Sequence, residues 1–320
     1  MSADNKVLDD KNNRDVIVTQ GSTLRRSKRI RRILVSPQFR LAVPCLVLAF
    51  LWYIIFVIGP VFQGFAMSFQ DYIVLDPAAS SFVGFDNFVT LFTYDRFWTS
   101  VLNTVAYTTL RYVAQVPAAV LIAWCISTIV RGRSFYLFVV FLPVVVSLVA
   151  ISLLFRSLMN PDFGLFNTVL RGVGLPTSKW IFGEESAVAS VALVDVWKSL
   201  GFFVVLLTAA MLSVSQDQQD AARVDGAGSW HVFYCITLPS ILPTLALVSV
   251  FTVHNGLEVY VSPTVMGPGP GTSTLMLNQL IVDTAFDSFN LSLATAASFV
   301  LFVFVLILTV VQLRLLRVKA

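Results

Sequence analysis

The chain has 320 residues, of which 57% are hydrophobic and only 12% charged. This balance, with a mean hydropathy of +0.80, excludes an ordinary soluble domain. Apolar runs of roughly 20 residues, long enough to cross about 30 Å of hydrocarbon, recur along the chain. Because these runs lack the alternation of barrel strands, the sequence predicts an all-α polytopic membrane protein with six transmembrane helices. The six runs are residues 41–66, 101–129, 135–155, 187–213, 241–262 and 291–313.

Residues 1–40 precede the first run and carry ten Lys and Arg residues, including the stretch LRRSKRIRR at 24–32. The position of this stretch next to a span favours a topology anchor facing anionic lipid over a nucleic-acid site. The polar, aperiodic composition predicts a disordered tail over 1–40. We expect no cleavable signal peptide, because the first apolar run begins late and lacks a small-residue cleavage pattern.

The distribution of basic residues predicts the orientation of the six-helix domain, residues 41–320. With the N-terminus in the cytoplasm, the inner segments hold sixteen Lys and Arg residues and the outer loops four. An excess of Lys and Arg is typical of the cytoplasmic side of a membrane protein, so the sequence predicts that both termini are cytoplasmic.

Four charged residues lie deep within the apolar runs: Arg111, Asp195, Lys198 and Glu258. Asp195 and Lys198 are three residues apart, so they could pair locally on one helix or line a hydrophilic pathway. We expect Arg111 to lie nearer the interface than the run boundaries suggest, or to snorkel towards it.

The sequence lacks several common catalytic and nucleotide-binding motifs. It contains no HExxH or GxSxG motif and no GxxxxGK[ST] phosphate-binding loop. The three cysteines have no paired spacing that would suggest a disulfide framework or a metal site. We therefore expect a protein that is not an enzyme and has no metal or other cofactor of its own.

A polar segment at 215–240 separates the fourth and fifth runs. Asp217 to Val224 contains good helix formers, and Gly226 permits a sharp turn. Ser229 can cap a second short helix, which Pro239 ends or kinks before the fifth run. The predicted helix–turn–helix could enter a groove on a soluble partner or form an ordinary interfacial loop.

The same segment resembles the EAA motif of ABC-importer membrane subunits, E-A-A-x3-G-x9-I-x-L-P. The match comprises Asp220-Ala221-Ala222, then Gly226, then Ile236-x-Leu238-Pro239, and it departs from the pattern only in Asp220 for Glu. Other stretches resemble maltose-type sugar permeases, and the resemblance covers roughly residues 40–315. These stretches are FVGFDNFVTLF (82–92), FWTSVLNTVAYT (97–108), GLFNTVLRGVGLP (164–176) and VMGPGPGTST (265–274).

The resemblance implies the permease subunit of a type I ABC importer in a bacterial-type cell membrane. The implied partners are a second permease, expected to be a distinct chain, two ATPase subunits that bind ATP and Mg²⁺, an external solute-binding lipoprotein and membrane lipid, without nucleic acid. The implied solute is a di- or oligosaccharide or a related polyol or glycerol derivative. An ion-coupled carrier and a non-transporting scaffold are the alternatives.

The resemblance also assigns site residues. Those implied to contact or position the ATPase are Asp220, Ala221, Ala222, Asp225, Gly226, Ala227, Ile236, Leu238 and Pro239. A sugar pathway needs aromatic faces and hydrogen-bonding groups, and the candidates in spans four and five are Trp197, Lys198, Asn255, Glu258 and Tyr260. These side chains could equally make helix–helix hydrogen bonds.

Overall fold

The computed structural model describes residues 37–315, so most of the predicted basic tail and residues 316–320 lie outside the described residues. The chain has two compact units, residues 1–64 and 65–320, and each is described by itself. The described part of the first unit is helical, with α2 (Pro37–Tyr53), a π-helical turn (Ile54–Ile58) and the beginning of α3 (Gly59–Met67). These elements form an apolar candidate span over Val43–Met67, close to the predicted 41–66.

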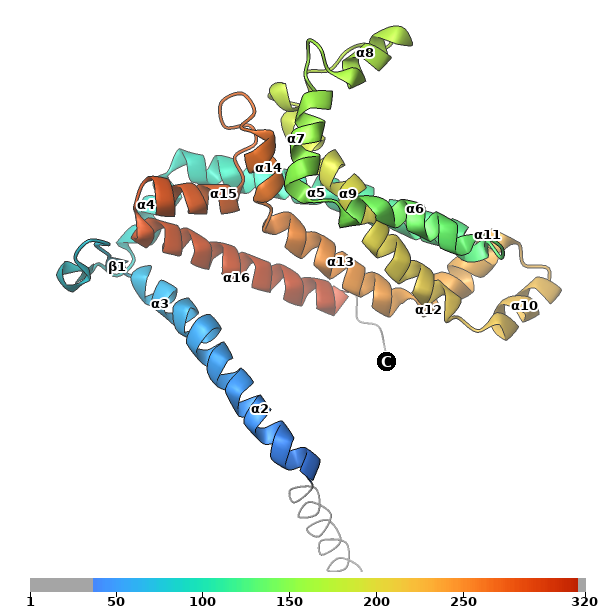
Figure 1. The fold of residues 1–320 in the computed structure, drawn as a ribbon, viewed down its shortest axis with the longest axis horizontal. Helices are drawn as coiled ribbons and strands as arrows, with labels where there is room; N and C mark the ends of the chain where they lie inside the picture. The colour runs from blue at the N-terminus through green and yellow to red at the C-terminus, as the bar shows by residue number, and fades with distance from the viewer. Residues whose placement is uncertain (1–36, 316–320) are drawn as a thin grey trace, which may run out of the picture. The chain divides into compact units, whose positions relative to one another are not determined.

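The second unit is almost entirely helical (Figure 1). Its one described sheet is the antiparallel pair β1 (Gln70–Asp71) and β2 (Ser81–Phe82), in which Gln70 pairs with Phe82. Its longer helices are α4 (Asp86–Thr93), α5 (Asp95–Thr128), α6 (Arg133–Val145), α7 (Leu148–Leu158), α8 (Leu165–Gly172), α9 (Ala187–Leu212), α10 (Gln216–Val224), α13 (Leu242–Leu257) and α16 (Leu291–Leu315). Its shorter helices are α11 (Ser229–Val232), α12 (Leu238–Ser240), α14 (Val261–Met266) and α15 (Leu277–Val282), with π-helical turns at Phe233–Thr237 and Asp283–Asp287.

Within residues 37–315, four of the six predicted spans are continuous helices. Six spans are reached if each of two bent pairs counts as one, namely α6 with α7 and the helical segment Ser229–Ser240 with α13. The predicted single helix at 135–155 is wrong, because α6 and α7 meet at 90°. Pro143 lies near the end of α6, where it cannot donate a backbone hydrogen bond. Three valines follow it, and their branched side chains favour extended backbone.

The predicted single helix at 241–262 is also wrong. α13 ends at Leu257, and the chain leaves the helix until α14 begins at Val261. The physical reason is Pro263, whose ring would clash with the carbonyl of Val259 in a continuous helix. At its other end α13 meets the helical segment Ser229–Ser240 at 72°.

α5 and α9 form the centre of the second unit, where they pack against each other along their length. α13 packs on α5, α6 packs on α9, and α14 packs on α7. α16 lies beside α13 and contacts α4 and α15 (Figure 1). Apolar side chains such as Phe203 and Leu207 of α9 are buried in this core, close to the polar segment at 215–240.

Candidate functional site

The polar segment at 215–240 forms two short helices joined by a left-handed turn, and we call residues 215–240 the coupling segment. α10 begins at Gln216, one residue before the predicted start, and ends at Val224 as predicted. Gly226 has a φ of +87°, in the left-handed region that favours glycine. The N–H of Gly226 bonds to the carbonyl of Arg223 at 3.0 Å, and that of Ala227 to Ala222 at 2.9 Å. These two bonds define a Schellman cap, so Gly226 occupies the position where glycine ends a helix.

The second helix of the coupling segment begins at Ser229, but Ser229 does not cap it. The capping residue is Gly228, and no side chain bonds to the free N–H groups. This corrects the predicted Ser229 cap: Ser229 already lies inside the helix. The helix continues through a π-helical turn to Ser240, one residue beyond Pro239, and there it bends towards α13.

Most of the predicted ATPase-contacting side chains of the coupling segment are accessible. Asp220, Ala221, Asp225 and Gly226 are exposed, whereas Ala222, Ala227 and Ile236 are half-buried and Pro239 is exposed. Leu238 packs against the apolar core between α5 and α9. Asp220 accepts a hydrogen bond from Arg223 at 2.8 Å, in an exposed ion pair within α10.

Aromatic rings attach the coupling segment to the end of α5. The ring of Trp124 lies 4.5 Å from that of Trp230 and 5.0 Å from that of Phe233, measured between centroids. Val232 and Phe233 are buried. Trp124 is not among the predicted site residues, because its partners lie more than a hundred residues away and no local pattern marks the contact.

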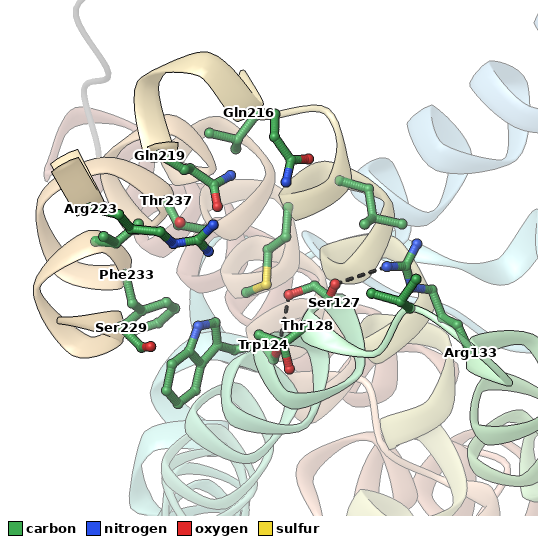
Figure 2. A pocket seen from close by; sticks show the side chains of 15 residues that line it. Trp124, Ser127, Thr128, Arg133, Gln216, Gln219, Arg223, Ser229, Phe233 and Thr237 are labelled. Atoms are coloured by element: carbon green, nitrogen blue, oxygen red, sulfur yellow. Dashed lines mark hydrogen bonds between the residues drawn. The ribbon is translucent and has the colours of Figure 1, made fainter. Parts of the chain in front are cut away.

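A cavity of about 560 Å³ lies between the coupling segment and the ends of α5 and α9. Figure 2 shows Gln216, Gln219 and Arg223 of α10 on one side and Trp124, Ser127 and Thr128 of α5 on the other. Arg133 donates to the Ser127 carbonyl at 2.9 Å and so caps the end of α5. The first helix of the coupling segment therefore rests over a hollow, while the second is packed on α5.

The predicted pathway residues of the fourth span lie at the break between α6 and α7. Trp197 is exposed, with its ring 5.3 Å from that of Phe155 in α7. The Lys198 Nζ donates to the carbonyl of Val144, near the end of α6, at 3.3 Å. Of the two alternatives for Asp195 and Lys198, local pairing is contradicted, because the Asp195 carboxylate accepts hydrogen bonds from Tyr107 and Ser262 instead.

The predicted pathway residues of the fifth span lie at the break between α13 and α14. Asn255 and Glu258 are exposed, although Glu258 lies just past the last helical residue of α13. Glu258 lies 3.3 Å from the imidazole of His254. Tyr260 is half-buried, and α14 begins directly after it. Discontinuous helices carry solute sites in many transporters, because their free backbone groups and polar side chains face a cavity.

A buried polar cluster lies beside the break between α13 and α14, and Arg111 belongs to it. Arg111 is only 7% exposed, so the expectation that it lies at or snorkels to the interface is wrong. The guanidinium donates to Gln115 Oε1 at 3.0 Å, to Ser199 Oγ at 3.3 Å and to Tyr107 Oη at 3.4 Å. We use the name buried polar cluster for Tyr107, Arg111, Gln115, Asp195, Ser199 and Ser262.

Known proteins share the sequence pattern and the architecture of this chain. The family model described as "Binding-protein-dependent transport system inner membrane component" matches residues 115–318. The chain is similar to the sn-glycerol-3-phosphate transport system permease protein of Escherichia coli, with 32% identity over 92% of this chain and 96% of the relative. It is also 32% identical to the diacetylchitobiose uptake system permease protein of Streptomyces coelicolor, over 78% of this chain and 74% of the relative.

Among solved structures, a chain of a bacterial ABC transporter involved in the import of the acidic polysaccharide alginate has a TM-score of 0.78. Its sequence identity is 26%, and the similarity covers 92% of this chain and 99% of that one. The family model covers more than half of the chain, and both named relatives exceed 30% identity over most of it. The protein therefore belongs to the binding-protein-dependent inner membrane components, the permease subunits of ABC transporters.

Proposed function

We propose that this permease imports a di- or oligosaccharide, or a related polyol or glycerol derivative, delivered by an external solute-binding protein. The similar proteins named above support this proposal, because their own solutes are sn-glycerol-3-phosphate, diacetylchitobiose and alginate. A solved relative in complex with an alginate-loaded periplasmic protein supports delivery by a binding protein. The single structural observation that carries the proposal is the coupling segment, with Asp220 and Ala221 exposed and a left-handed turn at Gly226.

In this proposal the permease is not an enzyme and holds no cofactor. Two ATPase subunits supply the energy with their own ATP and Mg²⁺, and a second permease of different sequence completes the pathway. The termini and the coupling segment lie in the cytoplasm, on the side where the basic residues gather.

The attachment of the coupling segment suggests how movement would reach the spans. Its second helix is joined to α13 through the bend after Ser240 and is packed on α5 through Trp124. A displacement of the coupling segment by the ATPases would therefore act on both helices at once. Rigid-body transitions of this kind need no change within the packed core.

The solute path in this proposal runs past the breaks in the third and fifth spans, where the amide of Asn255 and the carboxylate of Glu258 are exposed. Replacing both by alanine should alter the apparent KM for solute or the preference among solutes. The variant Thr264→Ala on α14 is a control, because within residues 37–315 its exposed hydroxyl bonds only to the Tyr260 carbonyl one turn away. Unchanged uptake kinetics in the double variant would remove these two residues from the path.

The deciding experiment uses the complete transporter in lipid vesicles with ATP inside and the solute-binding protein outside. Uptake should require ATP and the binding protein and should persist when ionophores collapse all ion gradients. Uptake that survives ATP depletion and collapses with an ion gradient would identify a secondary carrier. ATPase assembly without any uptake across a panel of neutral and anionic carbohydrates would indicate a scaffold.

A further inference from the structure

The break between α13 and α14 leaves a backbone carbonyl that an uninterrupted helix would have paired. The carbonyl of Asn255 would accept from the N–H of residue 259, which lies outside α13 in the described structure. Instead, Arg111 Nη1 of α5 donates to this carbonyl at 3.3 Å. A cationic side chain from another span thus replaces the missing helical hydrogen bond.

The same buried polar cluster also bonds to the other side of the break. Ser262, in the first turn of α14, donates its hydroxyl to the Asp195 carboxylate of α9. The Tyr107 hydroxyl donates to that carboxylate and accepts from Arg111, so it joins the two sides of the cluster. The cluster therefore ties α13 and α14 to the central pair α5 and α9 on both sides of the break.

Burial strengthens these hydrogen bonds, and removing one of them is strongly destabilising. Tyr107, Gln115 and Ser262 are fully buried, and Asp195 is 5% exposed. Hydrogen bonds are stronger in a low dielectric, and an unpaired charge there is strongly unfavourable. Charged residues within membrane spans are rare and are usually functional, so their placement at a break calls for an account beyond packing.

The surface of α5 next to the break is also closely packed. A Cβ on Gly256 would lie 2.8 Å from the side chain of Thr108, so only glycine lets α13 approach α5 this closely. Asn255 directly precedes Gly256 on the chain, and Glu258 follows it by two residues. Their orientation therefore depends on how firmly the end of α13 is held against α5.

We propose that the buried polar cluster is a clamp that fixes the break in the fifth span and positions the side chains of Asn255 and Glu258. The residues of the clamp do not touch the solute; they act through the backbone of α13 and α14. The part of this inference that concerns solute affinity rests on the proposed import function, whereas the part that concerns the break does not.

The test removes one hydroxyl from the clamp and compares it with a matched hydroxyl elsewhere on the same helix. Tyr107→Phe keeps the ring and breaks the bridge between Arg111 and Asp195. Tyr112→Phe is the control, because its hydroxyl lies 3.2 Å from Ser249 Oγ and joins α5 to α13 away from the break. A second, milder pair is Ser262→Ala with Ser249→Ala as its control.

The first readout is the distance distribution between spin labels on the two sides of the break, in the assembled transporter in lipid. The labels are placed by Leu247→Cys on α13 and Thr264→Cys on α14, both exposed, after replacement of the exposed cysteines Cys45, Cys125 and Cys235. The clamp variants should broaden or shift this distribution, and the controls should leave it as in the wild type. Identical distributions in clamp and control variants would overturn the inference.

The second readout is uptake kinetics in the vesicles described above. Tyr107→Phe should raise the KM for solute roughly tenfold, as expected for losing a hydrogen bond to a charged group, with basal ATP hydrolysis and the maximal rate little changed. A fall in the maximal rate at unchanged KM would contradict a positioning role. If the wild type imports no carbohydrate, the proposed function fails, and the spin-label distances still decide whether the clamp exists.

Discussion

Replacing Gly226 by alanine tests whether the left-handed turn of the coupling segment is what the ATPase requires. Gly226 has a φ of +87°, in the left-handed region. In that region the backbone conformation of a residue with a Cβ is less favourable by roughly 1–2 kcal/mol. A Cβ built on Gly226 meets no atom within 4 Å, so the cost is conformational and not steric. If ATPase binding requires this turn, its affinity should fall roughly 5- to 30-fold, since about 1.4 kcal/mol corresponds to a factor of ten.

The chain provides a matched control two residues away. Gly228 is also exposed and also has no atom within 4 Å of a built Cβ, but its φ is −70°, which any residue can adopt. Gly228→Ala should therefore bind the ATPase as the wild type does. Gly226→Asn should lose less affinity than Gly226→Ala, because asparagine tolerates the left-handed region. Gly226→Val should lose more than Gly226→Ala, because its branched side chain is stiffer.

The assay titrates purified ATPase subunits onto the permease pair in lipid nanodiscs, and a parallel measurement in vesicles gives the ratio of uptake to hydrolysis. All variants should insert and assemble with the partner permease, because neither glycine lies within a continuous span. Equal dissociation constants for Gly226→Ala and Gly228→Ala would show that the turn geometry does not matter. Wild-type uptake by Gly226→Val would refute the assignment of a coupling role.

Asp220→Ala should weaken ATPase binding by less than about 1 kcal/mol, because its ion pair is exposed, and a tenfold loss in the same titration would reveal a buried contact. Burial, and then the neighbouring Asp287 carboxylate, raise the pKa of Asp283 above its ordinary value. The stability from this group is present below the unfolded pKa and lost as pH rises through the folded pKa. The Tm of the wild type should therefore fall as pH rises above about 4, the ordinary pKa of an aspartate, whereas the Tm of Asp283→Asn should not show this fall. Parallel Tm curves would contradict this reasoning. An impermeant maleimide on intact cells should label Glu184→Cys but not Cys235 in single-cysteine proteins, and the reverse pattern would invert the proposed topology.

The spans and the coupling segment could be predicted from the sequence because their signals are local. Hydropathy over roughly 20 residues locates helices that must satisfy their own backbone in lipid. The turn at Gly226 follows from the Schellman pattern, in which a glycine ends a helix of good formers. The motif around this turn is also local, and it indicates the family without any tertiary contact.

The breaks in the third and fifth spans were missed although local signals exist for both. Pro143 lies within the third apolar run and Pro263 directly follows the fifth, and each lacks a backbone donor and ends or kinks a helix that would continue through it. Apolar composition alone does not distinguish a straight span from a broken one. The angle of 90° between α6 and α7 depends on what each half packs against, which includes Lys198 for α6 and Trp197 for α7.

Only the tertiary structure decided how the deep charges are satisfied. Asp195 and Lys198 are three residues apart, yet Asp195 bonds to Tyr107, 88 residues away, and to Ser262, 67 residues away. Arg111 is buried because the partners that compensate it come from α9 and α13. Spacing along a helix tells which side chains could meet on that helix. Spacing does not tell which other helix will pack against those side chains. In a low dielectric an unpaired charge is strongly unfavourable, so a buried charged side chain adopts the position in which most of its hydrogen bonds are made.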